Sequence, residues 1–153
     1  MKIAGIEVTE PHYAELVLPR GDKLIPFRAQ AVLDFEPFIK ACPEPEPPVQ
    51  MTARGKQKMV NDKGYLQAKL EWERRRNAWM VLKSLEPSQI EWVTVDIEKP
   101  GTWANYIEDL LSAKFSMVEI NRIIGIVQEA NCLDEEKLEW ARQVFAQGQQ
   151  TSH

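Results

Sequence analysis

The stretch from Trp103 to Gln147 constrains the fold most strongly, because it reads as three consecutive short amphipathic helices. Ser116 and Glu119 are three residues apart and match a capping box, the pair of reciprocal hydrogen bonds that starts many helices. Apolar residues then recur every three or four positions, as on the buried face of a helix. Asn131 suits the left-handed residue that often ends a helix. We expect helices over residues 103–113, 117–130 and 134–147.

In the remainder of the chain, the spacing of apolar residues differs from one segment to the next. In residues 2–33, three short runs alternate apolar and polar residues, which is typical of strands with one face on a core. Residues 90–97 alternate in the same way and would complete that sheet, whereas residues 65–85 hold strong helix formers without Gly or Pro. The sequence therefore predicts an α+β fold, with a small N-terminal antiparallel sheet of three to four strands and about four helices that follow it.

Length and composition suit one globular domain. The chain has 153 residues, of which 44% are hydrophobic and 27% charged, close to the average of folded proteins. The prolines at 43, 45, 47 and 48 favour an extended, solvent-exposed course. Within a single domain over residues 1–153, we expect a β-rich part (2–41), a Pro-rich and basic exposed linker or arm (42–63), a mainly helical part (64–147) and a frayed tail (148–153).

The charges are distributed unevenly. The net charge is −4, yet the stretch from Arg54 to Arg76 holds eight basic and three acidic residues and is strongly positive. Such asymmetry attracts an acidic partner or aligns copies of the chain head to tail, and it also occurs on solvated helix faces.

Residues suited to catalysis are sparse. His12 and His153 belong to no cluster of metal ligands, and the chain contains no phosphate-binding glycine loop and no nucleophile motif. The acidic run from Asp134 to Glu136 is interpreted as charge that favours the start of a helix. We expect a protein that is not an enzyme, with no catalytic residues, no cofactor and no metal.

Nucleic acid is one candidate partner of the basic stretch, since lysines and arginines contact phosphates and tryptophans stack on bases. Arginines at 74, 75 and 76 would point around more than half of a helix, and the rest of the chain is acidic, so we favour a protein contact or a solvated face. The candidate partner-binding residues are Trp72, Trp79, Leu138, Trp140 and Phe145. The candidate electrostatic patch comprises Arg54, Lys56, Lys58, Arg74, Arg75 and Arg76.

The sequence also bears on the compartment. It holds no apolar run of the roughly 18 residues that a membrane span needs, and MKIAGIEVTE lacks the apolar centre of a secretory signal. Cys42 and Cys132 are the only cysteines and stand far apart, which suits reduced thiols. We expect a cytosolic protein without a membrane partner.

Four segments carry a resemblance to a known family: FRAQAVLDFEPFIKACPEPEPP, WMVLKSLEPSQIEWVTVD, PGTWANYIEDL and FSMVEINRIIGIVQEANCLDEEKLEWARQVF. Together they resemble the tail assembly chaperones of tailed phages. The resemblance implies a non-catalytic protein of the bacterial host cytoplasm, absent from the mature virion. Such a protein would bind the tape measure protein or another phage tail protein and associate with copies of itself. Two alternatives remain open: a structural virion component, such as a head-tail connector or tail completion protein, and a small nucleic-acid-binding regulator.

Overall fold

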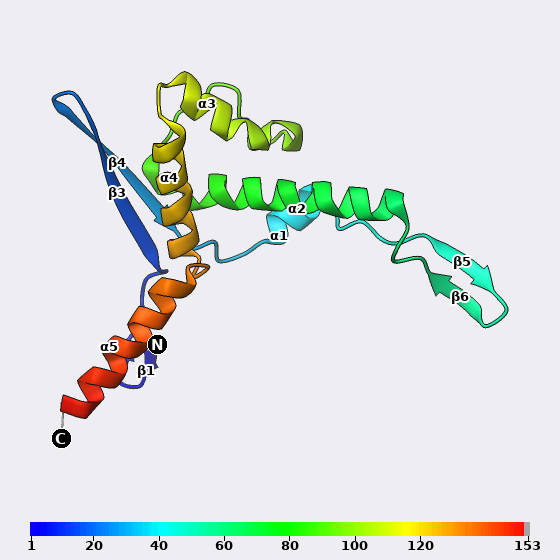
Figure 1. Cartoon of the computed structure of the whole chain (residues 1–153), viewed down its shortest axis with the longest axis horizontal. Coiled ribbons are helices and arrows are strands. Elements are labelled where there is room, and N and C mark those ends of the chain that lie inside the picture. Colours follow the sequence, from blue (N-terminus) through cyan, green and yellow to red (C-terminus); the bar gives the residue numbers. More distant parts are fainter. Residues whose placement is uncertain (152–153) are drawn as a thin grey trace. The chain divides into compact units, whose positions relative to one another are not determined.

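The computed structural model describes the backbone of residues 1–151 and the side chains of residues 1–148 (Figure 1). The chain forms two compact units. The first contains residues 1–33, 83–91 and 110 onward, and the second contains residues 34–82 and 92–109. The α+β class is confirmed. Each unit is built from segments that alternate along the chain. That residues 1–153 form a single domain remains a prediction.

The first unit is built on a long hairpin of β3 (Tyr13–Arg20) and β4 (Lys23–Gln30). Gly21 in its turn has a φ of 60°, a left-handed conformation that glycine adopts without steric cost. Alternate side chains face inward, as the period of two in the sequence predicts. The buried residues of the two strands are Ala14, Leu18, Phe27 and Ala29.

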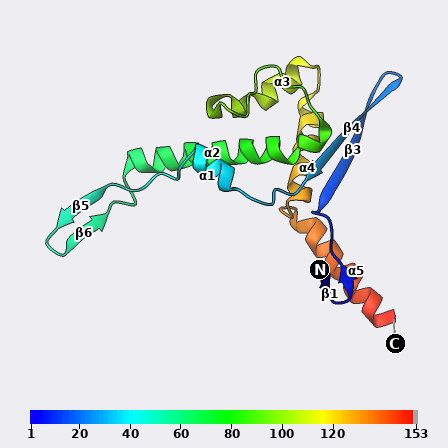
Figure 2. The ribbon, with the colours of Figure 1, turned by 180° about the vertical axis from the view of Figure 1, so that it is seen from behind.

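Helix α4 (Met117–Ala130) packs against both strands of this hairpin (Figures 1 and 2). The Ser116 hydroxyl accepts a hydrogen bond from the Glu119 backbone N–H, and the Glu119 carboxylate accepts one from the Ser116 N–H. The predicted capping box is thereby confirmed. The buried residues of α4 are Ile120, Ile123, Ile126, Val127 and Ala130.

Arg20, the last residue of β3, connects the hairpin to the start of α4. Its Nη1 and Nη2 lie 2.7 and 2.9 Å from the two carboxylate oxygens of Glu119, in the bidentate geometry that favours arginine. The guanidinium also lies 4.4 Å from the centroid of the Phe115 ring, which contacts Phe27 edge-on. The hydrogen bonds from Arg20, with that from the Ser116 N–H, lower the pKa of Glu119 to about 2.

Two polar side chains connect separate segments of this unit through hydrogen bonds. At the end of the 3-10 turn η1 (Glu86–Ser88), the Ser88 hydroxyl accepts a hydrogen bond from the Arg28 N–H and donates one to the Arg28 carbonyl, as the backbone of a neighbouring strand would. The Asn131 amide oxygen accepts from the Val32 N–H, and its nitrogen donates to the Ser84 hydroxyl. The left-handed residue predicted at Asn131 is found one position later, at Cys132, with a φ of 56°.

The predicted single N-terminal sheet is wrong in its connections. Among the strands of residues 1–151, β1 (Lys2–Ile3) and β2 (Ile6–Glu7) pair only with each other, and β3 pairs only with β4. Residues 90–97 form no strand. The Asp109 carboxylate accepts hydrogen bonds from the backbone N–H groups of Val93, Thr94 and Val95, so these groups are not available to a sheet.

The second unit gathers aromatic rings between α1 (Glu36–Ala41) and α2 (Lys63–Ser84), which lie side by side in Figures 1 and 2. The last two residues of α2 belong to the first unit. The fully buried Phe38 lies 5.4 Å from the ring of Trp72, 5.8 Å from that of Trp79 and 6.0 Å from that of Trp103. Trp103 belongs to the 3-10 helix η2 (Pro100–Asn105), which leads into α3 (Tyr106–Ser112).

A third hairpin occupies part of the predicted linker at 42–63. Strands β5 (Val49–Thr52) and β6 (Gly55–Lys58) pair in register. The Thr52 hydroxyl accepts from the Arg54 N–H and donates to the Gly55 carbonyl, and the φ of 101° at Gly55 suits glycine. All side chains of the two strands are exposed except that of Thr52, which is half-buried. The hairpin is exposed, whereas Cys42 at the start of the predicted arm is buried, and the arm contains strands that the sequence analysis did not predict.

The helix boundaries follow the sequence closely. The helix predicted at 65–85 is α2, and that predicted at 117–130 coincides with α4. The helix predicted at 103–113 is divided into η2 and α3. The last predicted helix is α5 (Glu135–Thr151), which continues beyond the expected end at 147, and the last two residues of the expected tail lie outside the described residues. Within residues 1–151, no helix is long and apolar enough to span a membrane.

Candidate protein-binding site

The candidate site is formed by α5. Asp134, just before the helix, accepts a hydrogen bond from the Lys137 backbone N–H, one of the N–H groups that a helix start leaves without a partner. Glu135 and Glu136 occupy the first turn, where the helix dipole favours negative charge. The acidic run therefore starts the helix, as the sequence reading proposed.

One side of α5 is apolar. Leu138, Ala141 and Phe145 follow one another at spacings of three and four residues, and so share a side of the helix. Trp140 and Val144, four residues apart, continue that side around the helix. These five residues are called the α5 apolar face below.

The α5 apolar face is not part of a core. Every side chain from Glu135 to Gly148 is exposed, with 63% of Trp140 and 66% of Phe145 accessible to solvent. Helix α4, with a similar amphipathic pattern, buries its apolar side against β3 and β4. A continuous exposed stripe with two large aromatic rings is the kind of surface that marks an interaction site.

The opposite side of α5 is polar. Glu139 accepts hydrogen bonds from Arg142 and Gln143, and the bond from Arg142 is the main reason that the pKa of Glu139 is lowered. Glu135 precedes Leu138 by three residues and Glu136 precedes Trp140 by four, so both carboxylates lie next to the α5 apolar face. Lys137, which precedes Trp140 by three residues and Ala141 by four, lies on the face itself, so the N-terminal part of the α5 apolar face has one cation between flanking carboxylates.

A shallow hollow adjoins the same part of α5. It is lined by His12, Glu129, Cys132, Asp134, Lys137, Leu138, Trp140 and Ala141. Within the described residues, no group of three or more His, Cys, Asp or Glu side chains is placed to hold a metal ion. The hollow extends the apolar face toward the end of α4 and offers a recess for a side chain of a bound partner.

The structure brings together three of the five predicted partner-binding residues. Leu138, Trp140 and Phe145 share the α5 apolar face. Trp79 is 3% exposed and packs against Phe35 and Phe38, so its assignment to a binding surface is wrong and it belongs to the core of the second unit.

Trp72 is also not part of an open binding face. It is half-buried, and its indole N–H donates to the Cys42 carbonyl at 2.8 Å. Its ring contacts Phe38 on one side, and the Arg76 guanidinium lies 5.3 Å from its centroid. These contacts explain the residue as a structural link between α1 and α2.

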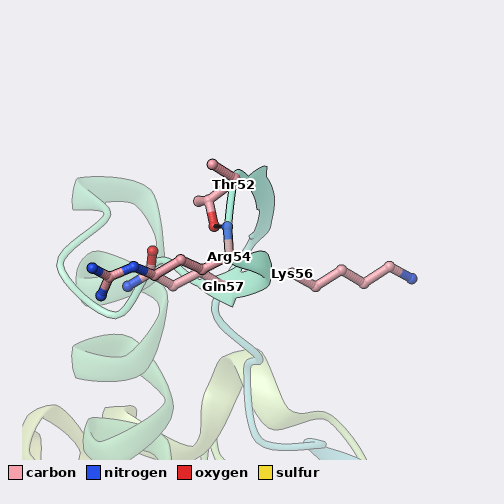
Figure 3. A pocket seen from close by; sticks show the side chains of 5 residues that line it. Thr52, Arg54, Lys56 and Gln57 are labelled. Atoms are coloured by element: carbon pink, nitrogen blue, oxygen red, sulfur yellow. Dashed lines mark hydrogen bonds between the residues drawn. The ribbon is translucent and has the colours of Figure 1, made fainter.

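The predicted electrostatic patch does not form one surface. Figure 3 shows Arg54 and Gln57 pointing to one side of the β5–β6 hairpin and Lys56 pointing to the other. Among the α2 arginines, Arg74 and Arg75 lie within 4 Å of the Glu71 carboxylate. The positive charge is thus divided between the two faces of a hairpin and a helix on which acidic and aromatic neighbours meet the arginines.

The hairpin contains apolar residues that the sequence reading passed over. Val49 is 57% exposed and Met51 is 71% exposed. Their alternation with Gln50 and Thr52 is the signal of a strand, and the Thr-Ala-Arg-Gly sequence that follows is a turn signal. Because the preceding proline run favours an extended linker, the sequence analysis did not predict the strand or the turn.

Comparison of the chain with protein-family models, curated proteins and solved structures finds no match. The case for a function therefore rests on the residues and surfaces described above.

Proposed function

We propose that this chain is a non-catalytic assembly chaperone of a tailed phage, and that it binds the tape measure protein while the tail is built. The observation that carries the proposal is the α5 apolar face, a helix side with Leu138, Trp140 and Phe145 exposed together. The sequence resemblance to tail assembly chaperones supplies the class of client. In this proposal the chain acts in the cytoplasm of the bacterial host and is absent from the mature virion.

The physical basis is helix-in-groove recognition. A long amphipathic client presents apolar residues at spacings of three and four, and a second apolar helix side can cover them. The exposed Trp140 and Phe145 are large and rigid, so their burial yields much free energy at a small cost in side-chain entropy. A chaperone with this surface keeps an aggregation-prone helix in solution without making or breaking a covalent bond.

The test is co-expression of the chain with the tape measure protein of the same phage, followed by affinity purification of the chain. The expected result is recovery of the client in soluble form. Leu138→Asp/Phe145→Asp places two charges on the α5 apolar face and should abolish recovery. Gln143→Asp/Ala146→Asp places two charges on the opposite side of the same helix and should retain it.

Several outcomes would contradict the proposal. One is a client that stays insoluble with the wild-type chain, and another is equal recovery by both double variants. Detection of the chain in purified virions at a fixed copy number would favour the structural alternative, a connector or tail completion protein.

A further inference from the structure

The β5–β6 hairpin is a second exposed surface, with a chemistry of its own. Strand register pairs Val49 with Lys58 and Met51 with Lys56, and directly opposed residues of an antiparallel pair project from the same face. That face therefore carries two apolar and two cationic side chains. It is called the hairpin cationic face below.

The other face of the hairpin is different in kind. Gln50 is paired with Gln57, and Thr52 is paired with Gly55. Figure 3 shows Gln57 and Arg54 directed away from Lys56. Apolar groups and lysines are thus segregated to one side of the ribbon, and this side has no acidic residue.

The hairpin cationic face matches the start of the α5 apolar face in both respects. Val49 and Met51 are more than half exposed and need an apolar counterpart, which Leu138 and Trp140 present. Lys56 and Lys58 favour a surface of negative charge. Glu135 and Glu136 supply it beside Leu138 and Trp140, and Lys137 offsets only part of it, because residues 134–137 hold three carboxylates and one amine. The two surfaces are complementary in charge and alike in their exposed apolar groups.

We infer that the hairpin cationic face of one copy of this chain docks on the N-terminal part of the α5 apolar face of a second copy. Each copy then offers one donor surface and one acceptor surface, so the contact is heterologous, and copies join head to tail into a ring or an open chain. This inference goes beyond the proposed function, because it needs only the chain itself and no client.

The size of the surfaces sets the expected strength. Each strand of the hairpin has four residues, so the contact falls below the roughly 1,200 Å² of a stable standard interface. Such a contact is weak and depends on electrostatic attraction between exposed groups, which salt screens over about 10 Å at 0.1 M. Association should therefore appear at high protein concentration and low ionic strength, and weaken as salt is added.

A charge-swap experiment on the full chain tests the inference. Variant A carries Lys56→Glu/Lys58→Glu, and variant B carries Glu135→Lys/Glu136→Lys. Each variant alone brings like charges together, so its association constant at low salt should fall by about tenfold or more in sedimentation velocity. An equimolar mixture of A and B restores opposite charges at every contact, and native mass spectrometry should show mixed A–B species.

The control has the same change in net charge as variant A, at exposed positions outside both surfaces. Lys23→Glu/Lys40→Glu should associate as the wild type does. Circular dichroism checks that each variant is folded. If a double variant does not fold, the single variant Lys58→Glu replaces variant A, or Glu136→Lys replaces variant B.

Three results would overturn the inference. The first is a wild-type chain that stays monomeric at all concentrations in low salt. The second is a variant A or B that associates as the wild type does. The third is an A–B mixture that stays monomeric, which would assign the hairpin to a different partner or to a contact within one chain. Client recovery in the co-expression test does not depend on any of these results, so the two proposals can fail separately.

Discussion

At the scale of single residues, Trp79 and Trp140 have opposite surroundings although both lie in helices. Trp79 is 3% exposed and surrounded by other aromatic rings, whereas Trp140 is 63% exposed. Burial of an aromatic ring contributes to folding only if the ring leaves water when the chain folds. The two residues therefore serve different purposes, one in the core and one on the surface.

Alanine substitution separates these roles. Trp79→Ala removes a buried ring and should lower the free energy of unfolding by about 3–5 kcal/mol. Trp140→Ala removes an exposed ring and should change it by no more than about 0.5 kcal/mol. Urea unfolding followed by circular dichroism measures both, and a large loss for Trp140→Ala would show that α5 is packed in the free protein.

Asp109 is a second residue whose surroundings determine its contribution to the stability of the fold. Burial by itself raises the pKa of this carboxyl, but the Thr94 hydroxyl and three backbone N–H groups donate hydrogen bonds to it, and the net pKa is lowered. A carboxylate with a lowered pKa in the folded state stabilises the fold above its unfolded pKa of about 3.9 and loses that effect as the pH falls through the folded value.

We expect Asp109→Ala to lower the free energy of unfolding at pH 7 by about 1–3 kcal/mol, because it leaves the N–H groups of residues 93–95 without their acceptor. The difference from the wild type should shrink as the pH falls below about 4. The exposed neighbour Glu108 provides the control, since Glu108→Ala removes a carboxylate from the same helix. Equal effects of the two substitutions would contradict the assigned role of Asp109.

At the scale of elements, the Arg20–Glu119 pair joins the β3–β4 hairpin to α4. The pKa of Glu119 is about 2 in the folded protein, and the unfolded value is about 4.3. Because the folded value is the lower one, the carboxylate stabilises the fold fully above about pH 5 and progressively less toward pH 2.

Glu119→Gln should therefore flatten the pH dependence of stability. The wild type should lose thermal stability more steeply between pH 5 and pH 3 than the variant does, although the variant is less stable at pH 7. Tm measured at several pH values shows the slope, and Glu10→Gln, at an exposed position, should keep the slope of the wild type. Equal slopes of Tm against pH for Glu119→Gln and the wild type would contradict the stabilising role of the Glu119 carboxylate.

Local signals in the sequence predicted the elements that depend on nearby residues. Ser116 and Glu119 are three residues apart and placed α4 correctly, and the alternation over Tyr13–Gln30 placed β3 and β4. The strand expected at 90–97 failed because Asp109, more than ten residues away, takes its N–H groups. The alternation of apolar and polar residues cannot reveal a hydrogen-bond acceptor that lies so far along the chain.

The candidate site was only partly accessible to the same reasoning. The amphipathic pattern of α5 identified Leu138, Trp140 and Phe145, but α4 has a similar pattern and is buried. A helical period shows that a side is apolar, not whether the same chain covers it. For that reason the sequence made Trp79 a candidate for the binding surface without excluding the core, and the structure places it in the core.

At the scale of the whole molecule, the chain presents two uncovered surfaces of opposite charge. The hairpin cationic face carries Lys56 and Lys58, and the first turn of α5 carries Glu135 and Glu136. In the account proposed here, self-association uses the hairpin and the start of α5, and client binding uses the length of the α5 apolar face. Since the two contacts overlap at Leu138 and Trp140, a bound client should weaken association between copies.

The central claim is that the α5 apolar face contacts the client, and site-specific photo-crosslinking tests it most directly. A photoreactive phenylalanine derivative is placed at position 145, on the apolar face, or at position 143, on the polar side, and the chain is co-expressed with the tape measure protein. The account predicts a crosslinked product from position 145 and little or none from position 143. A soluble complex that crosslinks equally from both positions, or from position 143 alone, would contradict it.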